Sequence, residues 1–236
     1  MKPFKSHHGI IAKLDRSNVD TDQIIAKQFL KSIARTGFGP QLFYDWRYKA
    51  DGTLNAGFSL NAPCFKNASI LVTGNNFGCG SSREHAVWAI KQYGFEVVVA
   101  PRMKKADGSE IPGFADIFKN NCSKNSLLTI ELGEAEVKQI FQVIDENTGL
   151  EATADLEKQL LVLHISAIDG TSSGASPKNR DRHQDLRQEI SFHFDIDASV
   201  KERLLHGLDD IGTTLKYEDA LRAFEAKHDP QISVNG

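Results

Sequence analysis

The stretch that decides the fold is residues 69–100, SILVTGNNFGCGSSREHAVWAIKQYGFEVVVA. It opens with a short apolar run at residues 69–72 and closes with a β-branched run at residues 96–100, and each run predicts a strand. Three glycines lie between residues 74 and 82, and residues 83–93 have the apolar spacing of a helix that a glycine then ends. Continuous apolar strands are typical of a parallel sheet covered on both faces. The stretch therefore predicts a strand–helix–strand unit and an α/β fold.

The flanking sequence continues this alternation of strands and helices. Further strands are predicted at residues 9–14, 127–132, 153–164 and 189–197. Further helices are predicted at residues 24–33, 114–123, 134–146, 199–205 and 217–227. The strands after residue 150 alternate apolar and polar side chains, as antiparallel strands do. We expect a single domain over residues 1–236 that is built on a mixed sheet.

Two segments offer little to a core and are expected to be surface insertions, at residues 102–112 and 169–188. The first is charged and centred on Asp107 and Gly108. The second is rich in Ser, Asp, Asn and Arg, a composition that favours an exposed and disordered segment. A short Gly-Ser replacement of the second is expected to leave folding and activity close to normal, because long surface loops add little entropic cost.

The composition excludes several classes of protein. With 40% apolar and 25% charged residues, the chain has the balance of an ordinary soluble globular protein. A net charge of −3 provides no basic field for nucleic acid or for an anionic membrane, so neither partner is expected. The sequence lacks the apolar run of about 20 residues that a membrane span needs. The first residues also lack the apolar stretch of a signal peptide, so a cytoplasmic location is expected.

The three cysteines are Cys64, Cys79 and Cys122. Their odd number and wide spacing argue against a disulfide framework, and the absence of a CxxC pair argues against zinc. An iron–sulfur cluster held by this chain alone would need three or four thiolates, normally with two of them clustered. We therefore expect neither a metal nor a cofactor in this chain, and we expect the cysteines to be small buried side chains.

The densest chemical signal is NNFGCGSSREH at residues 75–85, between a predicted strand and a predicted helix. Amide groups and the positive end of a helix converge at such a point, and an anion is the expected ligand. Familiar glycine-loop motifs do not fit. A Walker A loop needs lysine where Ser81 stands, a dinucleotide loop needs glycine where Arg83 stands, and a nucleophile elbow around Ser82 needs glycine at Glu84.

Spacing alone leaves two interpretations of this segment open. In the first, Ser81 and Glu84 form a capping box, His85 is a structural histidine and Arg83 is a surface cation. In the second, two serines and an arginine form a cradle for a carboxylate. An arginine in the first turn of a helix opposes the helix dipole, which favours the second interpretation.

The motifs in this region resemble a known family. GCGSSREH at residues 78–85 is similar to the serine–arginine loop of the swivelling domain of the aconitase superfamily, and residues 76–90 resemble the separate small subunit of bacterial isopropylmalate dehydratases. Further matching stretches are NVDTDQII at 18–25, KQFL at 27–30, RTGFG at 35–39, FADIF at 114–118 and GLDDIG at 207–212. The resemblance covers residues 9–48, 69–101, 113–148 and 189–228, and neither insertion interrupts a motif. It implies a swivelling β/β/α domain with a mixed, partly parallel sheet, as in the aconitase C-terminal domain.

The resemblance also implies an activity. Members of this family interconvert 2-isopropylmalate and 3-isopropylmalate by dehydration and rehydration through 2-isopropylmaleate, in leucine biosynthesis. The enzyme is a hydro-lyase that needs a large subunit as partner. The resemblance places a [4Fe–4S] cluster in that large subunit, where an open iron acts as a Lewis acid on the leaving hydroxyl.

The site residues carried over by the resemblance fall on three motifs. Ser81 matches the base that removes a proton next to a carboxylate, and Arg83 matches the arginine that stabilises it and binds substrate. Ser82 would donate a hydrogen bond to the small dicarboxylate substrate. Asp22 and Arg35 match two further substrate-binding positions, although their spacing differs by one residue from the aconitase pattern. A capping role for Asp22 and a structural turn at Arg35 are the alternatives.

Two other functions remain open from the sequence. The chain could be the small subunit of a related hydro-lyase of the homoaconitase or methylmalate/citraconate type, and substrate profiling of the assembled enzyme would separate these cases. It could also be a stand-alone carboxylate-binding module that uses residues 74–82 without chemistry. Tight ligand binding by the isolated chain, with no need for a partner, would favour the second alternative.

Overall fold

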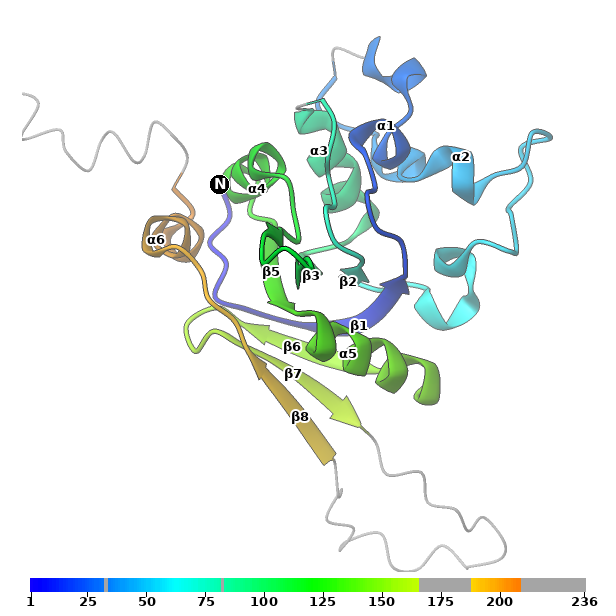
Figure 1. Cartoon of the computed structure of the whole chain (residues 1–236). Coiled ribbons are helices and arrows are strands. Elements are labelled where there is room, and N and C mark those ends of the chain that lie inside the picture. Colours follow the sequence, from blue (N-terminus) through cyan, green and yellow to red (C-terminus); the bar gives the residue numbers. More distant parts are fainter. Residues whose placement is uncertain (32–33, 82, 166–187, 209–236) are drawn as a thin grey trace, which may run out of the picture.

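The computed structural model describes residues 1–31, 34–81, 83–165 and 188–208 (Figure 1). The strands are β1 (Ser6–Leu14), β2 (Ile70–Thr73), β3 (Val97–Lys104), β4 (Glu110–Ile111), β5 (Leu128–Gly133), β6 (Glu151–Asp155), β7 (Leu160–Ile165) and β8 (Gln188–His193). The α-helices are α1 (Thr21–Ile24), α2 (Tyr44–Arg47), α3 (Glu84–Tyr93), α4 (Asp116–Lys124), α5 (Glu134–Glu146) and α6 (Ala198–His206). Four short 3-10 helices lie at η1 (Lys27–Lys31), η2 (Gly39–Gln41), η3 (Ser59–Asn61) and η4 (Pro63–Phe65).

The described strands form one mixed sheet, which confirms the predicted fold class. Its order is β4-β3-β2-β1-β6-β7-β8, and β5 pairs with β3 as well. Parallel pairing joins β1 to β2, β2 to β3 and β3 to β5. Antiparallel pairing joins the first half of β1 to β6 and continues through β7 and β8. β1 therefore belongs to both halves of the sheet.

The parallel strands are buried on both faces, as their continuous apolar sequences predict. All four residues of β2 and the first five of β3 are buried. Alternate side chains enter two cores: Leu71 and Val98 pack with α3 and α4, whereas Ile70 and Val97 pack with α5 and the antiparallel strands. Figure 1 shows α3 and α4 on one side of these strands and α5 on the other.

Two segments differ from the predicted strands and helices. Residues 153–164 are not one strand but the end of β6, a turn at residues 156–159 and most of β7. Gln159 takes a left-handed backbone (φ 57°), which lets the chain reverse without a glycine. The helix predicted at residues 24–33 is only the single turn α1 followed by η1, because Ile25 leaves the helix in an extended conformation and bridges to Leu42.

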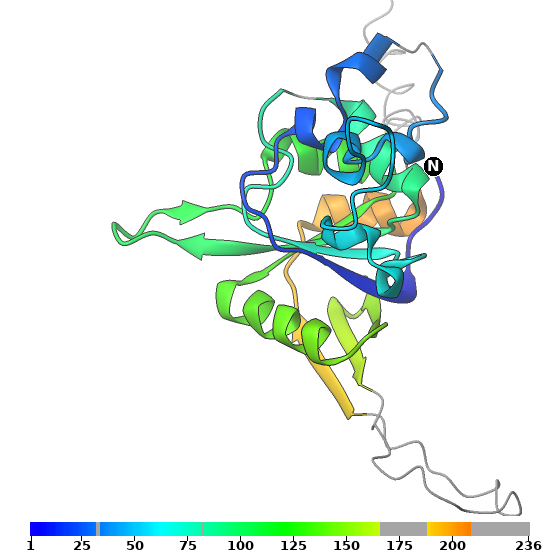
Figure 2. The same cartoon turned by 90° about the vertical axis from the view of Figure 1, so that its right-hand side faces the viewer.

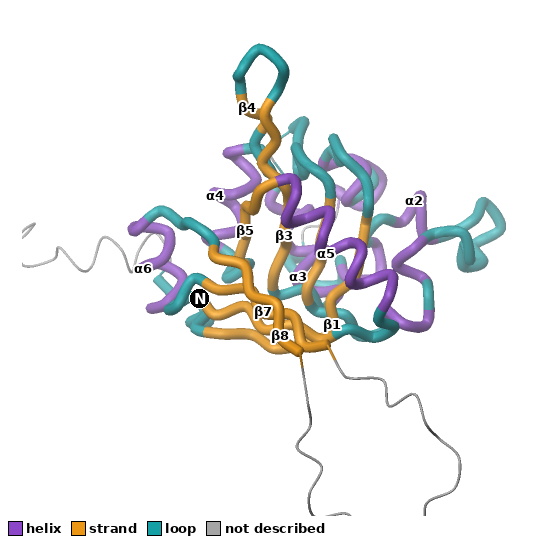
Figure 3. Tube along the Cα trace, turned by 60° about the horizontal axis from the view of Figure 1, so that its bottom comes forward, coloured by secondary structure: helices purple, strands orange, loops and turns teal. Residues whose placement is uncertain are grey.

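The insertion predicted at residues 102–112 is a β-hairpin. β3 continues to Lys104 and β4 returns beside it, with Met103 opposite Ile111. The hairpin projects from the body as an arm in Figure 2 and continues the line of β3 in Figure 3. The insertion predicted at 169–188 lies outside the described residues except for Gln188, and the helix predicted at 217–227 lies outside them entirely.

In the described part of the chain, none of the helices has the length and apolar character that crossing a bilayer requires.

Candidate active site

Two loops meet at the carboxyl edge of the parallel strands. Residues 15–22 follow β1 and residues 74–81 follow β2, and because the two strands are parallel neighbours their loops leave the sheet side by side. Backbone hydrogen bonds join the loops along their length. They run from Gly74 N to Arg16 O at 3.0 Å, from Asn18 N to Asn75 O at 2.9 Å and from Gly78 N to Val19 O at 2.8 Å.

Gly78 fixes the path of the second loop. Its backbone is left-handed (φ 74°), and an added Cβ would lie 2.3 Å from Cγ of Phe118 in α4. Any side chain there would meet both a backbone penalty and a buried aromatic ring. The close contact between this loop and α4 therefore requires glycine at position 78. This contact fixes the path of the residues that lead to Ser81.

Helix α3 begins later than the capping-box interpretation predicts. Its first residue is Glu84, and Arg83 occupies the N-cap position without a side-chain hydrogen bond. The carbonyl oxygen of an N-cap residue must accept the first helical hydrogen bond. At α3 it is the carbonyl of Arg83 that accepts such a bond, of 3.2 Å from Ala86 N, whereas the carbonyl of Ser81 accepts one of 2.8 Å from Oγ1 of Thr21. The capping role of Ser81 is thus wrong, and its side chain is exposed at the start of the site.

Asp22 reaches across from the first loop to Arg83. The carboxylate of Asp22 forms an ion pair with Nη1 of Arg83 and a second one of 3.3 Å with Nζ of Lys27. Only 17% of the Arg83 side chain is exposed, against 38% of the Asp22 side chain, so the arginine is the more covered partner of the pair. The Asp22 carboxylate also offsets the unfavourable position of a cation beside the amino end of α3.

The cap of α1 is Asp20 and not Asp22. Oδ1 of Asp20 accepts a hydrogen bond of 2.7 Å from Gln23 N, and Oε1 of Gln23 accepts one of 2.9 Å from Asp20 N. This is a capping box, and it rules out the capping alternative for Asp22. The sequence contained the signal, since an acidic residue three positions before glutamine fits the capping pattern. Asp22 is thereby left on the outer side of the first turn, where it meets Arg83.

Arg35 lies beside α3 rather than in contact with Asp22. Its guanidinium lies 5.8 Å from the centre of the Trp88 ring, and the residue is exposed. Gln92 holds this segment to the helix by two hydrogen bonds of 2.8 Å, donated to Arg35 O and accepted from Phe38 N. No local pattern signals this role for Gln92, because the contact joins residues 57 positions apart.

Two residues of the serine–arginine motif, His85 and Ser82, remain to be placed. The His85 ring packs edge-on against Phe38 at 5.3 Å and beside Trp88 at 4.8 Å, which supports its structural interpretation. Ser82 lies outside the described residues. The structure therefore brings together Ser81, Arg83 and Asp22, and it places Arg35 beside the helix that follows them.

The cysteines lie on separate elements. Cys64 is in η4, Cys79 is in the second loop and Cys122 is in α4. Burial raises the pKa of the Cys79 thiol and the nearby Asp20 carboxylate raises it further, while full burial raises the pKa of Cys122 well above its ordinary value. Both thiols thus stay protonated at neutral pH. Across the described ranges, no group of three or more His, Cys, Asp or Glu side chains is placed to hold a metal ion.

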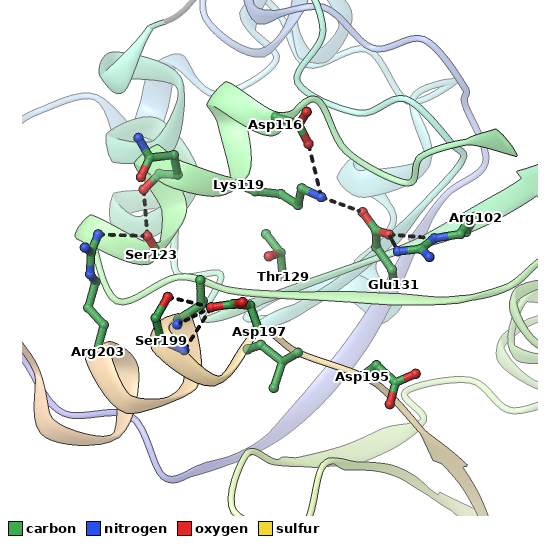
Figure 4. Close-up of a pocket in the computed structure, with 13 residues that line it drawn as sticks. Arg102, Asp116, Lys119, Ser123, Thr129, Glu131, Asp195, Asp197, Ser199 and Arg203 are labelled. Carbon is green, nitrogen blue, oxygen red and sulfur yellow. Dashed lines mark hydrogen bonds and ion pairs between the residues drawn. The ribbon is translucent and has the colours of Figure 1, made fainter.

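A cavity of about 610 Å³ lies elsewhere, between α4, β5 and α6 (Figure 4). Four of its charged side chains are paired with one another. The Glu131 carboxylate accepts hydrogen bonds from Arg102 at 2.6 Å and from Lys119 at 3.4 Å, and Lys119 also pairs with Asp116 at 3.3 Å. Of the site residues that the structure describes, none lines this cavity. We therefore place the candidate site at the serine loop and not in this cavity.

The comparisons with known proteins agree with the fold described above. Residues 1–135 match the family model of the aconitase C-terminal domain, and residues 210–231 match that of the C-terminal domain of the 3-isopropylmalate dehydratase small subunit. A crystal structure of 3-isopropylmalate dehydratase from Methanocaldococcus jannaschii has a TM-score of 0.54 at 22% identity, covering 93% of this chain and 99% of that chain. This likeness shows a common fold.

Three curated relatives are similar over nearly their whole length, and each is named 3-isopropylmalate dehydratase small subunit. The protein of Desulforapulum autotrophicum is 50% identical over 227 residues, which is 96% of each chain. That of Rhodopirellula baltica is 47% identical, covering 95% of this chain and 98% of its own length. That of Brevibacillus brevis is 44% identical, covering 96% of this chain and all of its own length.

Proposed function

The chain belongs to the family of 3-isopropylmalate dehydratase small subunits, and from this premise we propose that its serine loop supplies the catalytic base of the enzyme. Membership of this family means that the chain is the small subunit of a hydro-lyase, which works with a large subunit. The reaction is the interconversion of 2-isopropylmalate and 3-isopropylmalate by dehydration and rehydration, in leucine biosynthesis. The observation that carries the site assignment is the release of Ser81 from any capping role, beside the ion pair of Arg83 and Asp22.

Ser81 takes the proton in the dehydration step. The proton lies on a carbon next to a carboxylate, and Ser81 accepts it as the alkoxide, which becomes the hydroxyl; the alkoxide forms only if its negative charge is stabilised. Two features of the chain supply that stabilisation. The first is the set of free amide groups at the amino end of α3, which begins two to three residues after Ser81. The second is the guanidinium of Arg83, which is two residues after Ser81 in the chain. In the reverse direction Ser81 returns the proton to carbon.

Arg83 binds the substrate carboxylate next to the reacting carbon. Its planar guanidinium has five donors in a fixed fork, and the ion pair with Asp22 engages Nη1. Asp22 then acts as the group that holds the fork in place. An ion pair of this kind orients the arginine, and the remaining donors suit a bidentate carboxylate.

Arg35 and Ser82 complete the recognition of a dicarboxylate in this proposal. Arg35 is exposed, its main chain is tethered to α3 through Gln92, and its guanidinium lies over the Trp88 ring of the same helix. It would take the second carboxylate of the substrate. Ser82, which follows the base in sequence, would donate a hydrogen bond to the substrate.

The partner closes the site. Ser81 lies at the carboxyl edge of the parallel strands and Arg35 beside α3, and both are exposed, so water would compete with substrate for their hydrogen bonds. A second protein covering this edge would exclude that water and form a shared cleft. We propose that this protein is the large subunit and that it holds the [4Fe–4S] cluster, which supplies the Lewis acid for the leaving hydroxyl. The three separated cysteines of this chain do not fit the usual thiolate set of such a cluster.

The test is to purify the chain alone under anaerobic conditions, supply iron and sulfide, and assay it with and without a large subunit. The chain alone should stay colourless and inactive on 2-isopropylmalate, and the pair should turn over. A panel of homocitrate-like and methylmalate-like acids would identify a different hydro-lyase. Cluster absorbance together with turnover by this chain alone would contradict the proposal.

A further inference from the structure

Thr21 lies at the centre of the contact between the two site loops. It is the first residue of α1 and only 2% of it is exposed. Its backbone N–H donates a hydrogen bond of 3.0 Å to the carbonyl of Cys79, and its hydroxyl donates one of 2.8 Å to the carbonyl of Ser81. One buried residue of the first loop thus holds the second loop on both sides of Gly80.

The next residue continues the same contact. Asp22 pairs with Arg83, so two consecutive residues of the first loop hold positions 79, 81 and 83 of the second. Gly80 lies against Thr21: an added Cβ at Gly80 would be 3.8 Å from the Thr21 hydroxyl. The backbone of Gly80 is left-handed (φ 87°), a conformation that glycine adopts without cost. The chain before Ser81 and the carbonyl of Ser81 itself are therefore both constrained.

We propose that Thr21 is a positioning residue that aims the Ser81 side chain at the substrate, an inference that rests on the proposed role of Ser81 as base. The Thr21 hydroxyl fixes the orientation of the Ser81 carbonyl. With the Gly80 turn on the other side, this fixes the direction of the Cα–Cβ bond of Ser81. Proton transfer needs the acceptor within hydrogen-bond reach of the C–H bond, and a displacement of about 1 Å costs up to about 100-fold in rate.

The chain offers a matched control for this role. Thr73, at the end of β2, is fully buried, and its hydroxyl donates a hydrogen bond of 3.2 Å to the carbonyl of Arg16 in the first loop. It is therefore a second buried threonine that bonds a loop carbonyl between the same two segments. It does not contact Ser81. Replacing each threonine by valine removes one hydroxyl from a buried site of equal shape, so general loosening of the loops would affect both variants alike.

The experiment compares four variants in the enzyme assembled with its large subunit: Thr21→Val, Thr21→Ser, Thr73→Val and Ser81→Ala. Steady-state kinetics on 2-isopropylmalate and thermal unfolding are measured for each. Thr21→Val should lower kcat by about 10-fold or more with little change in KM, because the lost contact misplaces a reacting group and not a binding group. Thr21→Ser keeps the donor and should restore most of kcat. Thr73→Val should retain the kcat of the unsubstituted enzyme.

The outcomes separate this inference from the proposed function. Wild-type kcat in Thr21→Val, with turnover abolished in Ser81→Ala, would overturn the positioning role alone. Equal losses of kcat and melting temperature in Thr21→Val and Thr73→Val would overturn it as well, since both threonines would then act only on the fold. If Ser81→Ala itself keeps most of its turnover, the proposed function fails and this inference fails with it.

Discussion

β2 and the first five residues of β3 are buried on both faces, whereas β6 and β7 alternate buried with more exposed side chains. The two halves of the sheet also differ in what lies at the ends of their strands. In the parallel half, the carboxyl ends of β1, β2, β3 and β5 all reach the same edge, and the loops that follow β1 and β2 meet there. In the antiparallel half, the described chain between β6 and β7 turns back in a short hairpin.

The direction of the strands explains why the candidate site lies where it does. Parallel strands collect several chain ends and the amino end of a helix at one edge, and this concentrates amide donors and charged side chains. β1 links the halves, because it begins in the antiparallel pairing with β6 and ends in the parallel pairing with β2. Its final residues lead directly to Thr21 and Asp22. The antiparallel half thus supports the core, and the parallel half is where we place the chemistry.

The comparison can be tested with one glycine from each region. Gly78, in the site loop, and Gly149, between α5 and β6, have almost the same left-handed backbone, with φ of 74° and 73°. An added Cβ at Gly78 meets the Phe118 ring, whereas nothing lies within 4 Å of one at Gly149. Gly149→Ala should cost about 1–2 kcal/mol of unfolding free energy for the backbone alone. Gly78→Ala should cost about 2–5 kcal/mol, because overpacking adds to that penalty. Urea unfolding of both variants checks this, and equal losses would contradict the tight packing of the loop on α4.

Recognition at the edge is tested by Arg35→Lys. Lysine keeps the charge but loses the planar fork, so KM for 2-isopropylmalate should rise about tenfold, the size of one charge-assisted hydrogen bond. Arg47→Lys is the control, since Arg47 also stacks on an aromatic ring of α3, 4.6 Å from the centre of Tyr93. Its substitution should leave KM unchanged. Equal KM values for the unsubstituted enzyme and Arg35→Lys, across a panel of dicarboxylates, would remove Arg35 from the site.

The smallest effect concerns His7, where the two halves join. Its Nε2 lies 2.7 Å from the Ser69 hydroxyl, and burial lowers its pKa, with Glu96 opposing this shift. A lowered pKa means that the unfolded chain binds this proton more readily than the folded chain does. The His7 contribution is therefore complete above the ordinary histidine pKa of about 6.5 and is lost as the pH falls through the lower folded value.

The His7 prediction is checked by urea unfolding at pH values on both sides of this window. His7→Gln should lose less stability on acidification than the unsubstituted chain does. If both lose the same amount, the acid sensitivity has another origin, and His7 does not couple the two halves.

Strong local periodicity made much of the fold predictable from the sequence. The amphipathic pattern at residues 134–146 predicts the bounds of α5 without error, and the β-branched run at residues 96–100 predicts the start of β3 to within one residue. The turn that separates β6 from β7 escaped prediction because it contains neither glycine nor proline, and Gln159 takes the left-handed conformation there.

The site was harder to predict because its geometry depends on contacts between distant residues. Ser81 and Glu84 fit a capping box locally, but α3 begins at Glu84 with Arg83 at its N-cap position, and the carbonyl of Ser81 bonds to Thr21, 60 positions earlier. Likewise, the sequence offers both Asp20 and Asp22 as caps, and only the packing of the two loops shows that Asp20 caps α1 while Asp22 pairs with Arg83. Residue types at the site were therefore predictable, whereas their partners were not.

The central claim is that Ser81 acts as a base and not as part of the fold. The most direct measurement is kcat on 2-isopropylmalate for Ser81→Ala assembled with the large subunit, together with the melting temperature of the variant. Because the Ser81 side chain caps no helix, stability and assembly should be unchanged, while loss of a general base should lower kcat by about 100-fold or more. A variant that keeps most of its kcat would contradict the claim.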